Sequence, residues 1–431
     1  MKIAIAAYGV EGQASYRYYS KDPLNHITIF DQNPNFVGPE GVPTVVGPDA
    51  FDKLQDFDLV LRSPPIPPNH LKTRGKVWSG TNEFFVRSPA PIIGVTGTKG
   101  KGTTASMITS ILQAAGKKVW LVGNIGTAAL DVLPKITAAD VVVYEMSSFQ
   151  LWDIEKSPHI AVVLPIEPDH LNVHTDMADY IDAKEHIRRF QTVTDVCIYY
   201  PNNQYAKQIA ESNTMAPKEK YSIPDDGGVY WKNNAFYASE HIICSADVMQ
   251  VPGLHNIENA CAAITAVRHL GVSNDAIAEG LRNFKGLPHR IEFIREFEGV
   301  KYYNDSFSSA PGATIAAINS FAKPELIVLG GIDKGSDFND LIEVIKSHEN
   351  VKELILIGEI RHKLQLLFEE AGVVTKTTVL DSRTMSEIVE YLTLQASDGD
   401  VVLLSPACAS FDMFRDFYDR GDQFRSIVNS L

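Results

Sequence analysis

A glycine-rich stretch, GVTGTKGKGTT at residues 94–104, holds the residues best suited to chemistry in this chain. It follows a short apolar run that ends at Ile93 and precedes apolar residues at helical spacing between 105 and 112. In a turn between a strand and a helix, glycines let backbone N–H groups converge on phosphate oxygens, and Lys101 can reach the terminal phosphates. Val95 at the first glycine position and Gly102 after the lysine depart from the strict phosphate-loop pattern.

We therefore predict a loop that binds nucleotide phosphates. Its residues are Gly97, Thr98, Lys99, Gly100, Lys101, Gly102, Thr103 and Thr104. Because Gly102 carries no hydroxyl, Thr103 or Thr104 has to supply any metal-facing oxygen. The alternative is an ordinary glycine-rich turn with a surface lysine.

Two further apolar runs end in side chains that can bind a cation. Glu145 closes the run 140–145, and Asp169 and His170 follow the run 160–166. The carboxyl ends of parallel strands meet at one edge of a sheet, so an acid there is well placed to bind magnesium. The carboxylate–histidine turn indicates a second metal position. The alternatives are a solvated acid and a histidine with satisfied hydrogen bonds.

Polar residues at other strand and helix ends complete the candidate set. Ser147 and Gln150 follow the acidic strand end and can hold substrate phosphates. Asp31 ends a strand about 20 residues after a glycine-containing turn, which is the spacing of a nucleotide-binding βαβ unit. Asn256 and Asn259 lie on one helix face. The alternatives are a plain strand-end aspartate and a helix-capping asparagine.

The elements that must position these residues alternate between strand and helix along most of the chain. This alternation predicts an α/β protein, and a hairpin turn is expected at Glu298-Gly299. We expect three domains: an N-terminal Rossmann-like domain at 1–89, a central domain with a P-loop ATPase-like parallel sheet at 90–287, and a C-terminal Rossmann-like domain at 288–431.

Composition excludes several classes of protein. The chain has 431 residues, too many for one compact core, and its net charge of -14 argues against a nucleic-acid-binding protein. The four cysteines lack metal-ligand spacing, so we expect reduced and mostly buried thiols. The first residues are typical of a strand, so we expect no signal peptide, and no apolar run approaches membrane-spanning length. We expect a cytoplasmic protein without membrane insertion.

Together, the motifs resemble the Mur ligase family, the ATP-dependent enzymes that join an amino acid to a carboxylate. The resemblance covers nearly the whole chain and is closest to the branch that adds D-glutamate to UDP-N-acetylmuramoyl-L-alanine in peptidoglycan precursor synthesis. The motifs that carry it are the phosphate loop, Gly-Asn-Ile-Gly at 123–126, Glu-Met-Ser-Ser-Phe-Gln-Leu at 145–151, Asp169-His170, His255-Asn256, Leu-Pro-His-Arg at 287–290, Asn304-Asp305-Ser306, Gly-Gly-Ile-Asp-Lys at 330–334 and Ser-Pro-Ala-Cys-Ala-Ser at 405–410.

The resemblance implies a role for each candidate residue. The uridine-substrate site would consist of Val10, Glu11, Asp31, Asn124, Ser147 and Gln150. The ATP site would add Asn256, Asn259, Arg290 and Asp305 to the phosphate loop, and the incoming amino acid would meet Ser309, Lys334, Ser410, Phe411 and Phe417. Of two magnesium ions, one would be held by Thr103 and Glu145 and the other by His170 and carbamoylated Lys184. The catalytic set would be Lys101, Glu145, His170 and Lys184.

The resemblance also implies a reaction. The substrate carboxylate would take the γ-phosphate of ATP to form an acyl phosphate, which the amine of the amino acid would then attack. Among these residues Lys184 has a simple alternative, because a single lysine is by default a solvated surface residue.

We expect the protein to be a monomer.

Two departures from the family leave alternatives open. Family members usually have Asp-Ser-Lys-Ala-Thr-Asn where this chain has Asp-Ser-Phe-Ser-Ser-Ala at 305–310, so Phe307 removes a cation from near the amino-acid site. Another amino acid, such as L-glutamate, therefore stays open. Gly102 is shared with folylpolyglutamate synthases, but that family begins almost directly at the phosphate loop, whereas about 90 residues precede it here. A nucleotide-binding protein without turnover is the third alternative.

Overall fold

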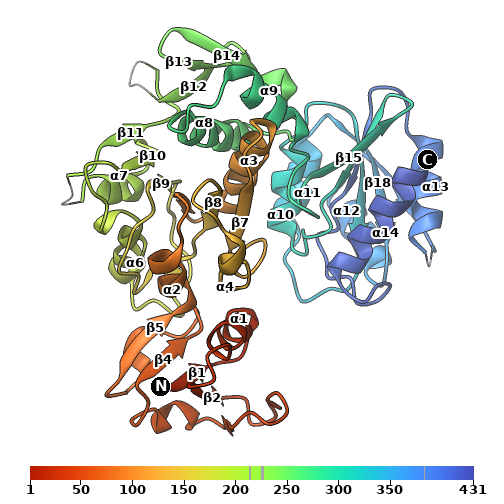
Figure 1. The fold of residues 1–431 in the computed structure, drawn as a ribbon. Coiled ribbons are helices and arrows are strands. Elements are labelled where there is room, and N and C mark those ends of the chain that lie inside the picture. The colour runs from red at the N-terminus through yellow and green to blue at the C-terminus, as the bar shows by residue number, and fades with distance from the viewer. Residues whose placement is uncertain (213–214, 225–227, 383) are drawn as a thin grey trace. The chain divides into compact units, whose positions relative to one another are not determined.

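The computed structural model describes residues 1–212, 215–224, 228–382 and 384–431. The chain folds into two compact units (Figure 1). The first contains residues 1–248 and 257–281, and the second contains residues 249–256 and 282–431. Within the described residues, no helix has the length and apolar character needed to cross a membrane.

The first unit begins with a five-stranded parallel sheet in the order β3-β2-β1-β4-β5. Its strands are β1 (Lys2–Ala6), β2 (His26–Asp31), β3 (Thr44–Val46), β4 (Leu59–Arg62) and β5 (Lys76–Ser79), and its helices are α1 (Val10–Tyr19) and α2 (Gly80–Arg87). The chain runs outward from β1 to β3 and then continues on the other side with β4 and β5. The strand order therefore reverses between β1 and β4, where open α/β sheets bind ligands.

A six-stranded parallel sheet, in the order β11-β10-β9-β6-β8-β7, also belongs to this unit. Its strands are β6 (Ile92–Thr96), β7 (Val119–Gly123), β8 (Val141–Glu145), β9 (Ile160–Val163), β10 (Val196–Tyr199) and β11 (Lys218–Lys220). The helices that follow are α3 (Lys101–Ala114), α4 (Ala129–Val132), α5 (Ser148–Leu151), α6 (Met177–Arg189), α7 (Gln204–Ala210), α8 (Leu254–Arg268) and α9 (Asn274–Asn283). Residues 254–256 of α8 and 282–283 of α9 belong to the second unit. β6, β8 and β9 are buried throughout, as expected of strands covered on both faces.

A small antiparallel sheet of β12 (Val229–Lys232), β13 (Ala235–Ala238) and β14 (His241–Ser245) completes the first unit. Short 3₁₀ turns lie at Ala50–Lys53, Pro68–His70, Leu133–Lys135 and Ala246–Val248. β3, β5 and β10–β14 were not predicted from the sequence, because each has only three to five residues, too few to show a clear period.

The second unit is built on a six-stranded sheet in the order β15-β16-β20-β17-β18-β19. Its strands are β15 (Glu292–Phe297), β16 (Val300–Asn304), β17 (Glu325–Gly330), β18 (Val351–Ile357), β19 (Lys376–Val379) and β20 (Val401–Leu404). Its helices are α10 (Pro311–Ile318), α11 (Asn339–Ser347), α12 (Arg361–Glu370), α13 (Met385–Gln395) and α14 (Phe417–Ser430). All pairs are parallel except β15 with β16, and the strand order reverses between β17 and β20.

Several predictions about the fold are confirmed. The protein is α/β with parallel sheets in more than one unit. Glu298 and Gly299 form the predicted hairpin turn with φ of 49° and 76°, the positive values that a two-residue hairpin turn requires. None of the four cysteines, which all lie among the described residues, forms a disulfide, and three of them are buried. The boundaries 1–89, 90–287 and 288–431 stay a prediction.

Candidate active site

The predicted phosphate loop joins β6 to α3, which begins at Lys101. Gly97 and Gly100 adopt φ of 152° and 81°, a backbone region that favours glycine. Close neighbours add a second constraint, because a Cβ on Gly100 would come within 2.5 Å of Asn259 Oδ1 and one on Gly97 within 2.7 Å of Leu164 Cβ. The predicted order of strand, glycine turn and helix is confirmed. It leaves backbone N–H groups at a helix N-terminus, where an anion is stabilised.

Lys184 lies beneath this loop. It is 1% exposed, and its Nζ donates to Gly97 O at 2.9 Å and to Thr96 Oγ1 at 3.4 Å. The centre of the Tyr180 ring lies 4.7 Å from the same nitrogen. Burial holds the pKa of Lys184 well below its usual value, and the charge of Lys101 lowers it further. The default interpretation of Lys184 as a solvated surface lysine is therefore wrong.

Glu145 is buried at the end of β8, 3% exposed. Its Oε1 accepts a hydrogen bond from Asn124 Nδ2 at 3.0 Å, and Asn124 N donates to Glu145 O at 3.0 Å. The charges of Glu145 and Asp169 both raise the pKa of Lys184, against the larger effect of burial. The structure thus brings an acid predicted to bind metal together with a residue predicted to bind substrate. The alternative of a solvated strand-end acid is wrong for Glu145.

His170 lies in a turn after β9 with a left-handed backbone, φ 56°. Its carbonyl accepts hydrogen bonds from the backbone N–H groups of Val173 and His174, both at 3.0 Å. Its ring centre lies 4.9 Å from that of Phe149, and its Nε2 is 3.4 Å from Asp169 Oδ2. The side chain is 47% exposed, so solvent and a bound ion can reach it.

The residues predicted for the uridine substrate follow strands of the two parallel sheets of the first unit. Gln150 Nε2 donates to Glu11 Oε1 at 2.6 Å, and Gln150 Oε1 accepts from Ser147 N at 3.0 Å as part of the capping box of α5. Burial raises the pKa of Glu11, and the hydrogen bond from Gln150 opposes that rise. Asp31 ends β2 and accepts one backbone N–H on each oxygen, at 2.9 and 3.3 Å. Val10 is exposed at the start of α1.

In the second unit, the loops after β17 and β20 meet where the strand order reverses. Ile332 N donates to Ala409 O at 2.8 Å, so the two loops lie side by side. Lys334 Nζ lies 5.5 Å from the centre of the Phe411 ring, and Ser410 is buried beside Ala409. Three residues predicted to meet the amino acid therefore gather at the crevice where an α/β sheet binds its ligand.

Phe307 and Phe417 form an aromatic contact in the same unit. Their ring centres lie 5.2 Å apart at an interplanar angle of 88°. Arg290 Cζ lies 3.8 Å from the centre of the Phe307 ring, a cation–π distance. An arginine predicted for the ATP site is therefore stacked on the residue that departs from the family, and Ser309 is exposed close by in the chain.

Asp305 is buried and hydrogen-bonded within the second unit. Its carboxylate accepts from Ser308 Oγ at 2.6 Å, Ser405 Oγ at 2.7 Å and Ile291 N at 3.1 Å. Burial raises the pKa of Asp305 to about 6, although these hydrogen bonds lower it. The hydrogen bonds of Asp305 thus connect the end of β16 to the loop after β20.

Asn256 and Asn259 both lie in α8, which begins at Leu254. Asn256 is therefore the third residue of the helix, and its Nδ2 donates to Pro252 O at 2.6 Å. The helix-capping alternative for Asn256 is wrong, because the helix starts two residues earlier. Asn259 lies against Gly100 of the phosphate loop, as described above.

Comparison with known proteins covers both units. The Mur ligase middle domain matches residues 95–267, and the Mur ligase glutamate ligase domain matches residues 289–408. UDP-N-acetylmuramoylalanine–D-glutamate ligase of Clostridium tetani is 34% identical over 100% of this chain and 97% of its own length. The enzyme of the same name from Streptococcus thermophilus is 35% identical, with the same coverage. The chain belongs to the Mur ligase family.

Solved structures of Mur ligases and their relatives share this fold. UDP-N-acetylmuramate–alanine ligase of Thermotoga maritima superimposes with a TM-score of 0.61 at 16% identity, covering 100% of this chain and 99% of that one. E. coli FolC, solved in complex with DHPP and ADP, gives a TM-score of 0.52 at 19% identity and covers 81% of this chain and 92% of its own. At these identities the likeness concerns the fold.

Two buried arginines support the site of this Mur ligase, and the sequence analysis gave them no role. Arg62, at the end of β4, forms an ion pair with Asp153 and donates to Phe149 O at 2.9 Å. Arg420 in α14 donates to Ser306 Oγ at 2.9 Å and to Cys408 O at 3.2 Å. An arginine at the end of an otherwise apolar strand was the available signal for Arg62.

The donor set suits magnesium. Among the described residues, no group of three or more His, Cys, Asp or Glu side chains forms a metal cluster. The predicted sets instead combine a carboxylate with a hydroxyl and with a modified lysine. Within the described part of the chain the buried hydroxyl of Thr104 has no hydrogen-bond partner, whereas Thr103 is half-buried. Hydroxyl and carboxylate oxygens are the donors that magnesium prefers.

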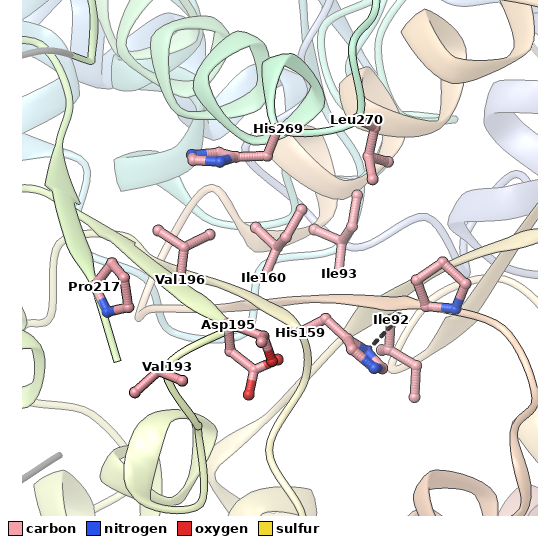
Figure 2. A pocket seen from close by; sticks show the side chains of 12 residues that line it. Ile92, Ile93, His159, Ile160, Val193, Asp195, Val196, Pro217, His269 and Leu270 are labelled. Atoms are coloured by element: carbon pink, nitrogen blue, oxygen red, sulfur yellow. Dashed lines mark hydrogen bonds between the residues drawn. The ribbon is translucent and has the colours of Figure 1, made fainter. Parts of the chain in front are cut away.

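A cavity of about 320 Å³ lies at the other end of the central sheet (Figure 2). It is lined by the first residues of β6, β9 and β10, together with His159, Asp195 and His269. His159 Nδ1 accepts from Ile92 N at 3.1 Å. Because the phosphate loop follows the carboxyl end of β6, this cavity is separate from the candidate active site.

Proposed function

We propose that this Mur ligase adds D-glutamate to UDP-N-acetylmuramoyl-L-alanine at the expense of ATP, through an acyl-phosphate intermediate. The reaction belongs to cytoplasmic peptidoglycan precursor synthesis. The observation that carries the proposal is that relatives named for this reaction are 34% and 35% identical over the whole chain. Each of these relatives aligns with both units, so the motifs of the two units match a single relative.

The residues around the phosphate loop would bring two anions together. The loop amides and Lys101 would bind the phosphates of ATP, because a helix N-terminus and a cation both stabilise negative charge. Glu11, Asp31, Asn124, Ser147 and Gln150 would bind the uridine substrate, with Val10 beside the base. The substrate carboxylate would then attack the γ-phosphorus, and ADP would leave.

Two magnesium ions would be held in this site. Glu145 with a loop threonine, Thr103 or Thr104, would hold one, and His170 with Lys184 would hold the other. When bound, magnesium neutralises the charge on the phosphates and the acyl group. A neutral buried lysine can attack carbon dioxide and lose a proton, which forms an N–C bond and leaves an anionic carbamate oxygen. The depressed pKa of Lys184 favours the neutral amine that this step needs.

The second unit would supply the amino acid. Lys334, Ser410, Phe411, Phe417 and Ser309 would surround it, while Asn256, Asn259, Arg290 and Asp305 would contact the nucleotide. The amine would attack the acyl carbon, and phosphate would leave. We further propose that the enzyme works as a monomer and binds no nucleic acid.

The test is an amino-acid screen with UDP-N-acetylmuramoyl-L-alanine, ATP and magnesium, scored by phosphate release and by the mass of the product. D-glutamate is expected to give the highest rate. Phe307 stands where family members usually have a lysine near the amino-acid site, which makes L-glutamate the second candidate, so both enantiomers are compared directly. Phosphate release with folate and glutamate, and none with the uridine substrate, would overturn the proposal.

A further inference from the structure

Ser148, His174 and Asp179 form a chain of two hydrogen bonds in the first unit. His174 Nε2 lies 2.9 Å from Ser148 Oγ, and His174 Nδ1 lies 3.1 Å from Asp179 Oδ2. Ser148 and His174 are each 2% exposed. The serine is sealed from solvent and substrate, so this set of residues is not a nucleophilic triad, although its order resembles one.

The partners define the direction of these bonds. The Asp179 carboxylate only accepts, and it also accepts from Thr175 N at 3.0 Å and from Trp152 Nε1 at 3.3 Å. In the neutral imidazole, Nδ1–H therefore donates to Asp179, and Nε2 accepts from the Ser148 hydroxyl. His174 thus links the first turn of α6 to the first residue of α5.

An aromatic stack connects this chain to His170. The ring of Phe149 lies parallel to that of His174, at 10° and 5.4 Å between centres, and its centre is 4.9 Å from that of His170. Trp152 contacts His174 at 4.4 Å, and Tyr180 contacts it edge-on at 5.1 Å. The ring of Phe149 therefore contacts both histidines.

The backbone contributes a second link. His174 N donates to His170 O, which closes the turn in which His170 has its left-handed conformation. A non-glycine residue in that region is held there by its surroundings. Ser148 and Asp179 support this turn through their hydrogen bonds with His174. Phe149 supports it through the contacts of its ring with both histidines.

We propose that His174 is a positioning residue that holds the ring and the turn of His170, through Ser148, Asp179 and Phe149. The inference rests on the proposed function, in which His170 binds the second metal ion. The geometry resembles the hydrogen-bonded supports of metal ligands, whose loss typically weakens metal binding about 10-fold to 100-fold. His174 contacts neither substrate nor nucleotide in this role.

The test uses manganese as a probe in the full-length protein saturated with a non-hydrolysable ATP analogue. Electron paramagnetic resonance counts the bound ions and gives their affinities. His174→Phe keeps the ring and removes both hydrogen bonds, and Ser148→Ala removes one of them. For His174→Phe we expect about 10-fold weaker binding of one ion, with the other unchanged. Excess magnesium should restore much of the ligase rate of the His174→Phe variant.

A matched control is His186→Asn. His186 lies in α6, the helix that also carries Asp179, and is half-buried, but its hydrogen bonds are to Asp182 O and Arg189. This variant is expected to bind both ions as the wild type does. If His174→Phe fails to fold, judged by thermal unfolding, Ser148→Ala decides the question with a smaller loss of the same ion.

Two results would overturn the inference. One is wild-type affinity for both ions in His174→Phe, and the other is an equal loss of both ions and of the ATP analogue. Failure of the proposed function is distinguishable, because it appears in the wild type as absence of the ligase product whatever the manganese binding.

Discussion

Glu325 allows the sharpest quantitative prediction about this protein. It is the first residue of β17, between Val351 of β18 and Val401 of β20, and it is fully buried. Within the described residues, neither of its carboxyl oxygens has a hydrogen-bond partner. Burial raises the pKa of Glu325 from 4.5 to about 9, because an unpaired charge is poorly stabilised away from water.

The sign and size of the effect follow from proton linkage. Between pH 4.5 and 9 the folded protein holds a proton on Glu325 that the unfolded chain has lost. Stability therefore falls with rising pH by about 1.4 kcal/mol per pH unit, which accumulates to about 3 kcal/mol at pH 7. Glu325→Gln keeps the shape and removes the ionisation, so we expect this variant to be more stable than the wild type by that amount.

The assay is urea unfolding at pH 5.5, 6.5 and 7.5. Hydrogen–deuterium exchange of peptides from β17 and β20 monitors the unfolding of the second unit. The four tryptophans lie at positions 78, 120, 152 and 231, all in the first unit. Tryptophan fluorescence therefore follows the first unit during the same titration. The difference in stability between Glu325→Gln and the wild type should grow by about 2.7 kcal/mol over this pH range.

Glu353 on the neighbouring strand β18 is the matched control. It is also buried, but its carboxylate accepts from Lys376 Nζ at 2.8 Å, Tyr391 Oη at 2.6 Å and Thr378 Oγ1 at 2.7 Å. Burial raises the pKa of Glu353, and these hydrogen bonds outweigh that effect and lower it. Glu353→Gln should destabilise the unit by about 1 to 3 kcal/mol. A stability difference for Glu325→Gln that is constant with pH would refute the reasoning.

Three further predictions concern the active site. Lys101→Ala should lower ATP-dependent phosphate release by about 100-fold or more, because it removes a cation from the phosphates; a variant with full turnover would argue against the phosphate loop. Lys184→Ala should lose activity that added short carboxylates partly restore, as measured in the same assay, and wild-type activity without them would reject the carbamate. Arg62→Met leaves Asp153 without its partner, so urea unfolding followed by tryptophan fluorescence should show a loss of about 3 to 5 kcal/mol; a loss below about 1 kcal/mol would show that the pair is not structurally important.

The sequence by itself determined the local parts of this protein. Glycines at 97 and 100 between an apolar run and a helical pattern predict the phosphate loop, because positive φ and a helix start are properties of a few adjacent residues. The hairpin at Glu298-Gly299 and the acid at the end of β8 are local in the same sense. The family motifs extend this knowledge across both units.

Only the tertiary structure decided which side chains are buried and what they contact. From the sequence alone, Lys184 is interpreted as a surface lysine. In the structure it lies in α6 beneath the phosphate loop, almost 90 positions earlier in the chain, and donates a hydrogen bond to Gly97 O. Arg290 and Phe307, or Ser148 and His174, meet for the same reason. The burial of a side chain and its contacts depend on distant segments that fold against one another. Periodicity and spacing along the sequence therefore do not predict them.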